Sequence, residues 1–280
     1  MTVRLSFKTA PQHTDWPGLR DMWREADQID LYSAGWLFDH FYPIFSDPTG
    51  PCMEGWTLLS VLAGMTQRVR LGIMVTGNPY RHPAVLANMA ATVDVASEGR
   101  LEIGIGAGWN QMEADGYGID LPPLRERFDR LEEACAVIDG LLTKETTSFD
   151  GRYYRLSEAR CEPKPAQSPR PPIVIGGGGE KRTLRIAARW ADQWNLASGT
   201  PEVLRHKVEV LHRHCADVGR DASEIEVSVQ LRDMGGPGPT AEAAAALRDA
   251  GAQHLVLTFP SPFDPAKLAP MAEAVAAAVR

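Results

Sequence analysis

The segment from residue 68 to residue 110 constrains the fold most, because it reads as strand, loop, helix, strand and glycine-rich turn. Residues 70–76 form a short apolar run that ends at the loop residues 77–79, which is typical of a strand buried on both faces. Pro83 fits the first position of the following helix and Gly99 the position just after its end. Two buried strands joined by a helix predict a parallel pair with a right-handed crossover.

The turn after the second of these strands, residues 104–110, is rich in glycine and invites a dinucleotide-binding interpretation. The G-x-G-x-x-G fingerprint does not fit, however. If the motif starts at Gly104, its sixth position is Trp109, and if it starts at Gly106, its sixth position is Gln111. That position requires a small residue. The turn therefore lets a flat or bulky group approach the backbone, but not in the manner of a nicotinamide-binding fold.

The same reading of the whole chain predicts eight strands separated by helical patterns. The chain has 280 residues, close to the roughly 250 of a single eight-stranded barrel. We therefore predict an α/β fold, a (β/α)8 TIM barrel that forms one domain over residues 1–280, with a doubly wound open sheet as the alternative. The expected strands are residues 3–8, 35–38, 70–76, 101–105, 173–175, 193–197, 225–231 and 254–258.

The connection between the fourth and fifth strands is longer than the others, and we interpret residues 109–172 as an insertion. A helical pattern covers residues 124–142. A turn at Asp150-Gly151 then indicates a hairpin, and the prolines that follow up to Pro172 exclude a helix.

Composition excludes several classes of protein. No run of about 18 apolar residues predicts a membrane span. The net charge of −7 argues against a nucleic-acid partner. The N-terminus lacks an export signal, so a cytoplasmic location is the expectation. No C-x-x-C pair occurs among the cysteines, which predicts reduced thiols and no zinc site: Cys52, Cys135, Cys161 and Cys215.

Active sites of such barrels lie at the carboxyl ends of the strands, so the residues that follow the strands are expected to share one rim. No G-x-S-x-G or H-E-x-x-H motif occurs, which argues against a hydrolase, and the histidines lack metal-ligand spacing. The residues expected to converge are Asp39, His40, Thr76, 106–110, 176–179, Trp194 and Asn195.

The glycine run 176–179 begins a predicted helix. Bare backbone N–H groups and the helix dipole both favour an anion there, so we interpret the run as a phosphate cradle. A rim of glycines, aromatic residues and small polar groups with such a cradle suits a flat phosphorylated cofactor. The structural alternatives are a tight turn for the glycines and a histidine that only closes a strand for His40.

Together these motifs resemble the luciferase-like monooxygenase superfamily and, within it, the deazaflavin-dependent oxidoreductases. The resemblance covers essentially the whole chain. It rests on residues 37–41, which read LFDHF, on 80–85, 99–109 and 175–179, and it extends to 127–133 and 190–195.

The resemblance implies coenzyme F420, an 8-hydroxy-5-deazaflavin, as cofactor, with FMN as the alternative. It implies that Asp39 and His40 are catalytic and lie against the ring, and that a non-prolyl cis peptide and a bulge occur near residues 73–75. Lys181 could meet the anionic tail of the coenzyme or be a solvated charge. The residues implied to bind the coenzyme are Asp39, Val75, Thr76, Gly106, Ala107, Gly108, Trp109, Asn110, Gly176, Gly177, Gly178, Gly179, Lys181 and Trp194.

Relatives that oxidise a sugar phosphate carry a tryptophan after Asp-His and a glutamate after the fourth-strand glycines, where this chain has Ile44 and Trp109. We therefore expect hydride transfer between the deazaflavin C5 and a small organic substrate, in the direction that reduces an unsaturated or imine-like compound. The alternatives are an FMN-dependent monooxygenase that uses reduced flavin and O2, and a non-catalytic flavin-binding barrel. The resemblance also implies a homodimer, with the helices over 54–65 and 83–95 as candidate faces.

Overall fold

A computed structural model describes residues 3–280. Within that range parallel strands occupy the eight positions, or staves, of a barrel, and β3 and β4 together form one of them. The barrel closes because β3 pairs with both β2 and β5. This confirms the predicted (β/α)8 TIM barrel. The staves are β1 (Arg4–Thr9), β2 (Ala34–Leu37), β3 (Arg70–Ile73) with the short β4 (Thr76–Gly77), β5 (Leu101–Gly106), β8 (Ile173–Gly176), β9 (Gln193–Leu196), β10 (Glu226–Arg232) and β11 (His254–Phe259).

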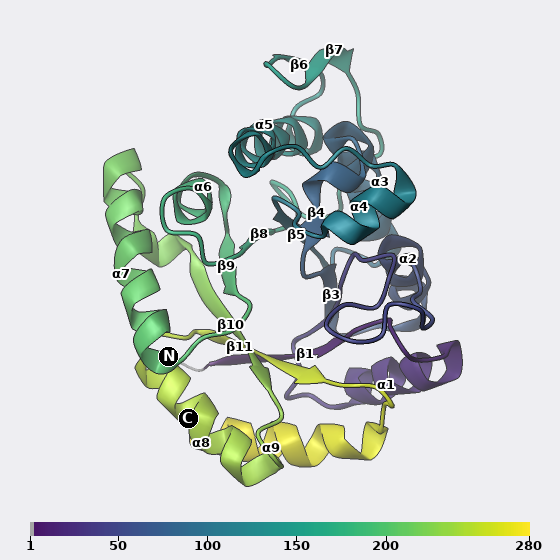
Figure 1. Cartoon of the computed structure of the whole chain (residues 1–280), viewed down its shortest axis with the longest axis vertical. Helices are drawn as coiled ribbons and strands as arrows, with labels where there is room; N and C mark the ends of the chain where they lie inside the picture. Colours follow the sequence, from purple (N-terminus) through teal and green to yellow (C-terminus); the bar gives the residue numbers. More distant parts are fainter. Residues whose placement is uncertain (1–2) are drawn as a thin grey trace.

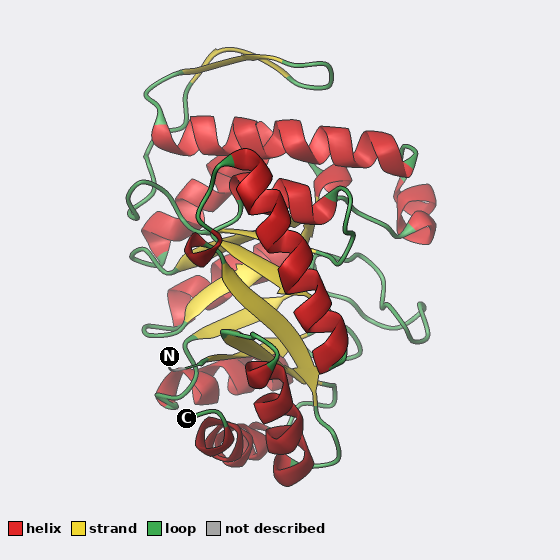
Figure 2. Ribbon diagram, turned by 90° about the vertical axis from the view of Figure 1, so that its left-hand side faces the viewer, coloured by secondary structure: helices red, strands yellow, loops and turns green. Residues whose placement is uncertain are grey.

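Helices surround the barrel (Figures 1 and 2). Two begin at side-chain caps of the residue types favoured there: the Asp15 side chain accepts from the N–H of Gly18, and Thr200 caps the helix that starts at Pro201. The helices are α1 (Trp16–Gln28), α2 (Gly55–Met65), α3 (Pro83–Ala96), α4 (Gln111–Tyr117), α5 (Leu124–Thr143), α6 (Thr183–Trp190), α7 (Pro201–Val218), α8 (Pro237–Asp249) and α9 (Leu268–Ala278), with 3-10 turns η1 (Asn78–Tyr80), η2 (Ala222–Glu224) and η3 (Pro265–Lys267).

The alternation of side chains along each strand separates two apolar regions. On β1, Leu5 and Phe7 belong to the large core that includes the buried faces of the helices. A small second cluster, which includes Trp36, Met74 and Val256, fills the inside of the barrel. Polar side chains occupy the two ends of the barrel interior. Those at the carboxyl end of the strands are available for a site.

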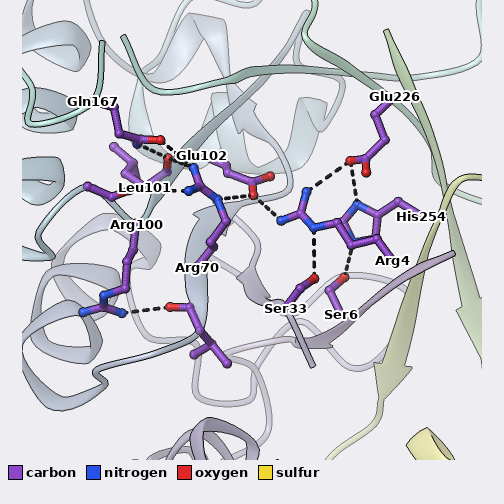
Figure 3. A network of polar contacts seen from close by, with 12 residues as sticks. Arg4, Ser6, Ser33, Arg70, Arg100, Leu101, Glu102, Gln167, Glu226 and His254 are labelled. Atoms are coloured by element: carbon purple, nitrogen blue, oxygen red, sulfur yellow. Dashed lines mark hydrogen bonds and ion pairs between the residues drawn. The ribbon is translucent and has the colours of Figure 1, made fainter. Parts of the chain in front are cut away.

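A buried ionic network closes the amino end of the barrel (Figure 3). Glu102 accepts from Arg4 and from Nε of Arg70, the latter at 2.7 Å, and Arg4 also reaches Glu226. His254 lies 3.2 Å from Glu226. Burial would raise the pKa of Glu102, but the two arginines outweigh it and hold that pKa below its usual range. Because this network lies at the starts of strands, we assign it to stability.

The third stave is interrupted where a continuous strand over 70–76 is expected. The strand ends at Ile73, a cis peptide joins Met74 to Val75, and pairing resumes at Thr76. This confirms the bulge and the non-prolyl cis bond implied by the resemblance. The neighbouring strand must have glycine at this point, because a Cβ on Gly104 would lie 1.9 Å from the Ile73 carbonyl oxygen.

The connection from β5 to β8 holds α4, α5 and a hairpin of β6 (Thr147–Asp150) and β7 (Arg155–Ala159). Figure 1 shows the hairpin beyond α5, away from the barrel. The expected hairpin and the helix over 124–142 are confirmed, whereas the sequence analysis missed α4. That the whole segment is an insertion stays a prediction. Among the described residues, no helix is long and apolar enough to cross a membrane.

Candidate active site

His40 and Glu113 form the polar centre of the rim. Nδ1 of His40, just after β2, lies 2.6 Å from Oε2 of Glu113 on α4. The side chain of Glu113 is fully buried and that of His40 nearly so. A carboxylate at this distance holds the proton on Nδ1 and leaves Nε2 as the nitrogen that can exchange a proton with a ligand.

Glu113 is held as a carboxylate by four donors. Besides His40, it accepts from the backbone N–H groups of Phe41 and Tyr42, at 2.7 and 3.0 Å, and from the Tyr80 hydroxyl at 2.7 Å. Burial alone would raise the pKa of Glu113, but the hydrogen bonds from His40, Tyr42 and Tyr80 outweigh it and hold that pKa below its usual range. Glu113 is absent from the predicted site residues, because the resemblance aligns the glutamate of the sugar-phosphate relatives with position 109.

Asp39, the residue before His40, has a different partner. Its Oδ1 accepts from Nη2 of Arg81 at 3.0 Å, and the same arginine reaches Glu54 at 3.3 Å. Burial raises the pKa of Asp39, and the arginine opposes this without cancelling it. The pair fixes the backbone from which His40 projects, and Arg81 is a second residue that sequence reasoning missed.

Glycines line one half of the barrel mouth, and the bulge residue Val75 fills the space they leave. A Cβ on Gly106 would lie 2.9 Å from Cγ2 of Val75, and one on Gly176 would lie 2.8 Å from its Cγ1. Any side chain at these two positions would displace the bulge. In this glycine half, defined by Val75, Gly106 and Gly176, the Val75 side chain packs directly on the strand backbone, so the surface at the mouth stays low enough for a flat ring.

A turn over residues 180–182 separates the glycine run from α6, which begins at Thr183, so the predicted helix start at the glycines is wrong by several residues. Gly177 has φ +120°, a value that favours glycine, and no side chain caps the helix at Arg182. Nearby, Arg127 donates to the Gly108 carbonyl at 2.7 Å, and its buried Nε has no partner within the described residues. The N–H groups at the start of α6 have no side-chain cap, and the Nε–H of Arg127 has no acceptor within the described residues. Both can donate hydrogen bonds to an anion, which supports the predicted cradle.

The structure corrects the placement of Trp194. Its side chain is fully buried in the core between barrel and helices, and Nε1 donates to the Gly177 carbonyl at 2.8 Å. Trp194 therefore supports the glycine loop from behind. Because side chains alternate along β9, the neighbouring Asn195 points into the barrel instead.

Aromatic residues form an exposed wall beside His40. The Trp109 and Phe45 rings stack with centroids 5.5 Å apart and planes 7° from parallel, and they are 52% and 84% exposed. Trp109 also lies edge-on to the His40 ring at 5.5 Å. Two flat apolar surfaces that are open to solvent beside His40 suit a flat apolar ligand.

Polar side chains line the other half of the mouth, opposite the glycines. Nζ of Lys8 donates to Oε1 of Gln230 at 2.9 Å, and Nε2 of Gln230 donates to Oδ1 of Asn195 at 2.9 Å. The Asn195 amide in turn donates to Ser228. We call Lys8, Gln230 and Asn195 the polar half.

The rim therefore brings together most of the predicted residues. Thr76 is fully buried and accepts from the indole of Trp56 at 2.8 Å, while Asn110 caps α4. Lys181 is exposed beside the glycine run. Contact of any of these residues with a coenzyme stays a prediction.

Comparisons with known proteins agree with this geometry. The family model described as luciferase-like monooxygenase matches residues 3–277. The F420-dependent glucose-6-phosphate dehydrogenase of Microbacterium testaceum is 30% identical over 233 residues, which cover 82% of this chain and 68% of that one.

Two solved structures share the fold. An F420-dependent secondary alcohol dehydrogenase in complex with an F420-acetone adduct superposes with a TM-score of 0.89 at 18% identity, over 100% of both chains. An EDTA monooxygenase from Chelativorans sp. BNC1 gives a TM-score of 0.82 at 14% identity, over 100% of this chain and 93% of that one.

Proposed function

Because the chain belongs to the luciferase-like monooxygenase family, we propose that it is an oxidoreductase that uses coenzyme F420 to transfer a hydride to or from a small organic substrate. One observation carries the proposal. The barrel mouth joins a glycine half, where Val75 packs directly over Gly106 and Gly176 and leaves room for a flat ring, to a histidine whose tautomer a buried carboxylate fixes.

The residues present fit the coenzyme. The glycine half would hold the deazaflavin ring, and the loop over residues 177–179, which leads through a turn to α6, would hold its phosphate. When bound, the deazaflavin supplies or accepts a hydride at C5. The relative from Microbacterium testaceum, whose name states F420 dependence, supports this cofactor.

His40 would exchange the proton that the coenzyme loses or gains together with the hydride. Glu113 keeps Nδ1 protonated, so Nε2 can accept or return a proton on the ligand side. The Asp39–Arg81 pair holds the adjacent backbone in place.

The substrate that fits is flat and apolar and carries an unsaturated bond. The Trp109–Phe45 stack offers aromatic surface, and Ile44 adds a further apolar side chain. A sugar phosphate is polar and anionic and would gain little from that wall. We therefore propose reduction of an unsaturated organic compound, although the relative is named for oxidation of glucose 6-phosphate.

A fluorescence titration of the protein with oxidised F420 and, separately, with FMN tests the proposal. Tight binding of F420 and weak binding of FMN are expected. Preference for FMN would contradict the proposal and favour an oxygen-using monooxygenase, as the name of the Chelativorans relative states for that protein. Binding of neither would leave a barrel without this chemistry.

The homodimer implied by the resemblance stays a proposal. The two candidate helices, α2 and α3, expose Val61, Val85 and Val95 at 46%, 54% and 41%. These side chains would be covered in a dimer, and size-exclusion chromatography with light scattering would detect it.

A further inference from the structure

Lys8 is a cation inside the barrel mouth with neutral partners. Its Nζ donates to the Met74 carbonyl at 3.2 Å and to Oε1 of Gln230 at 2.9 Å. An ammonium group has three N–H donors, so one remains for another acceptor. Since Lys8 is partly exposed at the carboxyl end of β1, that acceptor can come from the mouth.

The charge of Lys8 is uncompensated. Across residues 3–280, no carboxylate oxygen lies within 4.0 Å of its Nζ, and its charged neighbour is another cation, Arg232. Burial and Arg232 lower the pKa of Lys8 to about 8. An enclosed charge without a counter-charge is unfavourable in a purely structural role, and such groups concentrate at functional sites.

Hydrogen bonds fix where Lys8 lies. The Met74 carbonyl belongs to the residue before Val75, so Nζ lies where the polar half meets the glycine half. The Gln230 side chain is held in this orientation toward Lys8, because its amide nitrogen also donates to Asn195. A ligand group between the two halves would therefore meet the third N–H of Lys8.

We propose that Lys8 binds the carbonyl oxygen of the substrate and protonates it during reduction. This deepens the proposed function and rests on it. A hydride from the reduced coenzyme forms the new C–H bond and breaks the carbonyl π bond, and a proton from Nζ forms the O–H bond. The substrate is reduced, the coenzyme is oxidised, and the neutral amine regains its proton from water.

Benzoate is a suitable probe, since it is flat, apolar and carries sp² oxygens, and it can be tested without turnover. We expect Lys8→Met to weaken benzoate binding at least tenfold in isothermal titration calorimetry, about 1.4 kcal/mol. Lys164→Met is the matched control, because Lys164 is a half-buried lysine that donates to two backbone carbonyls, those of Leu141 and Cys161. That variant should bind benzoate like the wild type.

The F420 titration of Lys8→Met separates this inference from the proposed function. An F420 affinity within twofold of the wild type is expected. A tenfold loss would assign Lys8 to the coenzyme and overturn the inference, as would unchanged benzoate affinity. A wild type that fails to bind F420 would contradict the proposed function, while the benzoate comparison would still decide whether Lys8 binds oxygen.

A measurement on the wild type covers the case in which Lys8→Met does not fold. As the pH rises above about 8, benzoate affinity should fall about tenfold per pH unit because Lys8 becomes neutral, while Arg232 stays charged. Binding of benzyl alcohol should not follow this curve. The same titration of His40→Gln identifies any contribution of the imidazole, and a flat benzoate curve would overturn the inference.

Discussion

Nδ1 of His40 lies 2.6 Å from Oε2 of Glu113, although 73 positions separate the two residues. The pair joins the end of β2 to helix α4, a short helix that a generic barrel does not require. Because the buried carboxylate of Glu113 binds Nδ1, Nε2 is the nitrogen of His40 that faces the mouth.

We expect Glu113→Gln to lower kcat/KM by about 10–100-fold, as when a residue that orients a histidine is lost. The uncharged amide no longer holds the proton on Nδ1. Nitrogen chemical shifts of the imidazole would report the changed tautomer directly. Asp115→Asn, at an exposed position of the same helix, should leave both the shifts and kcat/KM unchanged. A wild-type tautomer in Glu113→Gln would refute the role given to Glu113.

Gly177→Asp should weaken F420 binding at least tenfold. Gly177 has φ +120°, where a side chain is strained, and the added carboxylate would repel the phosphate. Fluorescence titration measures the affinity, and thermal unfolding checks the fold. Gly219→Asp is the control, since Gly219 also has positive φ, +71°, with open space around its Cβ. Equal affinity of both variants would rule out the cradle.

Trp109→Ala should lower kcat/KM for flat apolar substrates by about 2–10-fold, because an aromatic stack is worth about 0.5–1.5 kcal/mol. The melting temperature should change little, since the Trp109 side chain is 52% exposed. Val203→Ala removes an exposed apolar group from α7 and should affect neither quantity. Selective loss for polar substrates, rather than flat apolar ones, would contradict the assignment of the wall.

Acidification should destabilise the protein through His254. Burial lowers its pKa from 6.5, against the opposing effect of Glu226, so the folded state keeps it neutral while the unfolded chain takes up a proton. Stability therefore falls as the pH drops. Between pH 7.5 and 5.5 this residue should contribute a loss of up to about 1.4 kcal/mol, the limit for a side chain that stays neutral in the folded state.

Urea unfolding at both pH values measures that loss. In His254→Gln the pH-dependent loss should shrink by about this amount, whatever the variant's stability at pH 7.5. His212→Gln, at an exposed position of α7, should keep the wild-type dependence. An identical dependence in His254→Gln would show that folding does not lower the pKa of His254.

The sequence by itself determined the elements of this fold. Apolar runs with glycine or proline at their ends locate all eight staves to within a few residues, and caps such as Asp15 and Thr200 locate helix starts. These signals are local, because a strand or a cap depends on residues within a few positions. They also placed Asp39, His40 and the glycine run at one rim.

Only the tertiary structure decided which side chains meet there. Glu113 reaches His40, Arg81 reaches Asp39 and Gln230 reaches Lys8 across 73, 42 and 222 positions, and no local pattern records such pairs. A shift of one residue along a strand also reverses the face, which is why Asn195 rather than Trp194 points inward. Closure of the barrel fixes both the partners and the faces, because it sets the register of each strand against its neighbours.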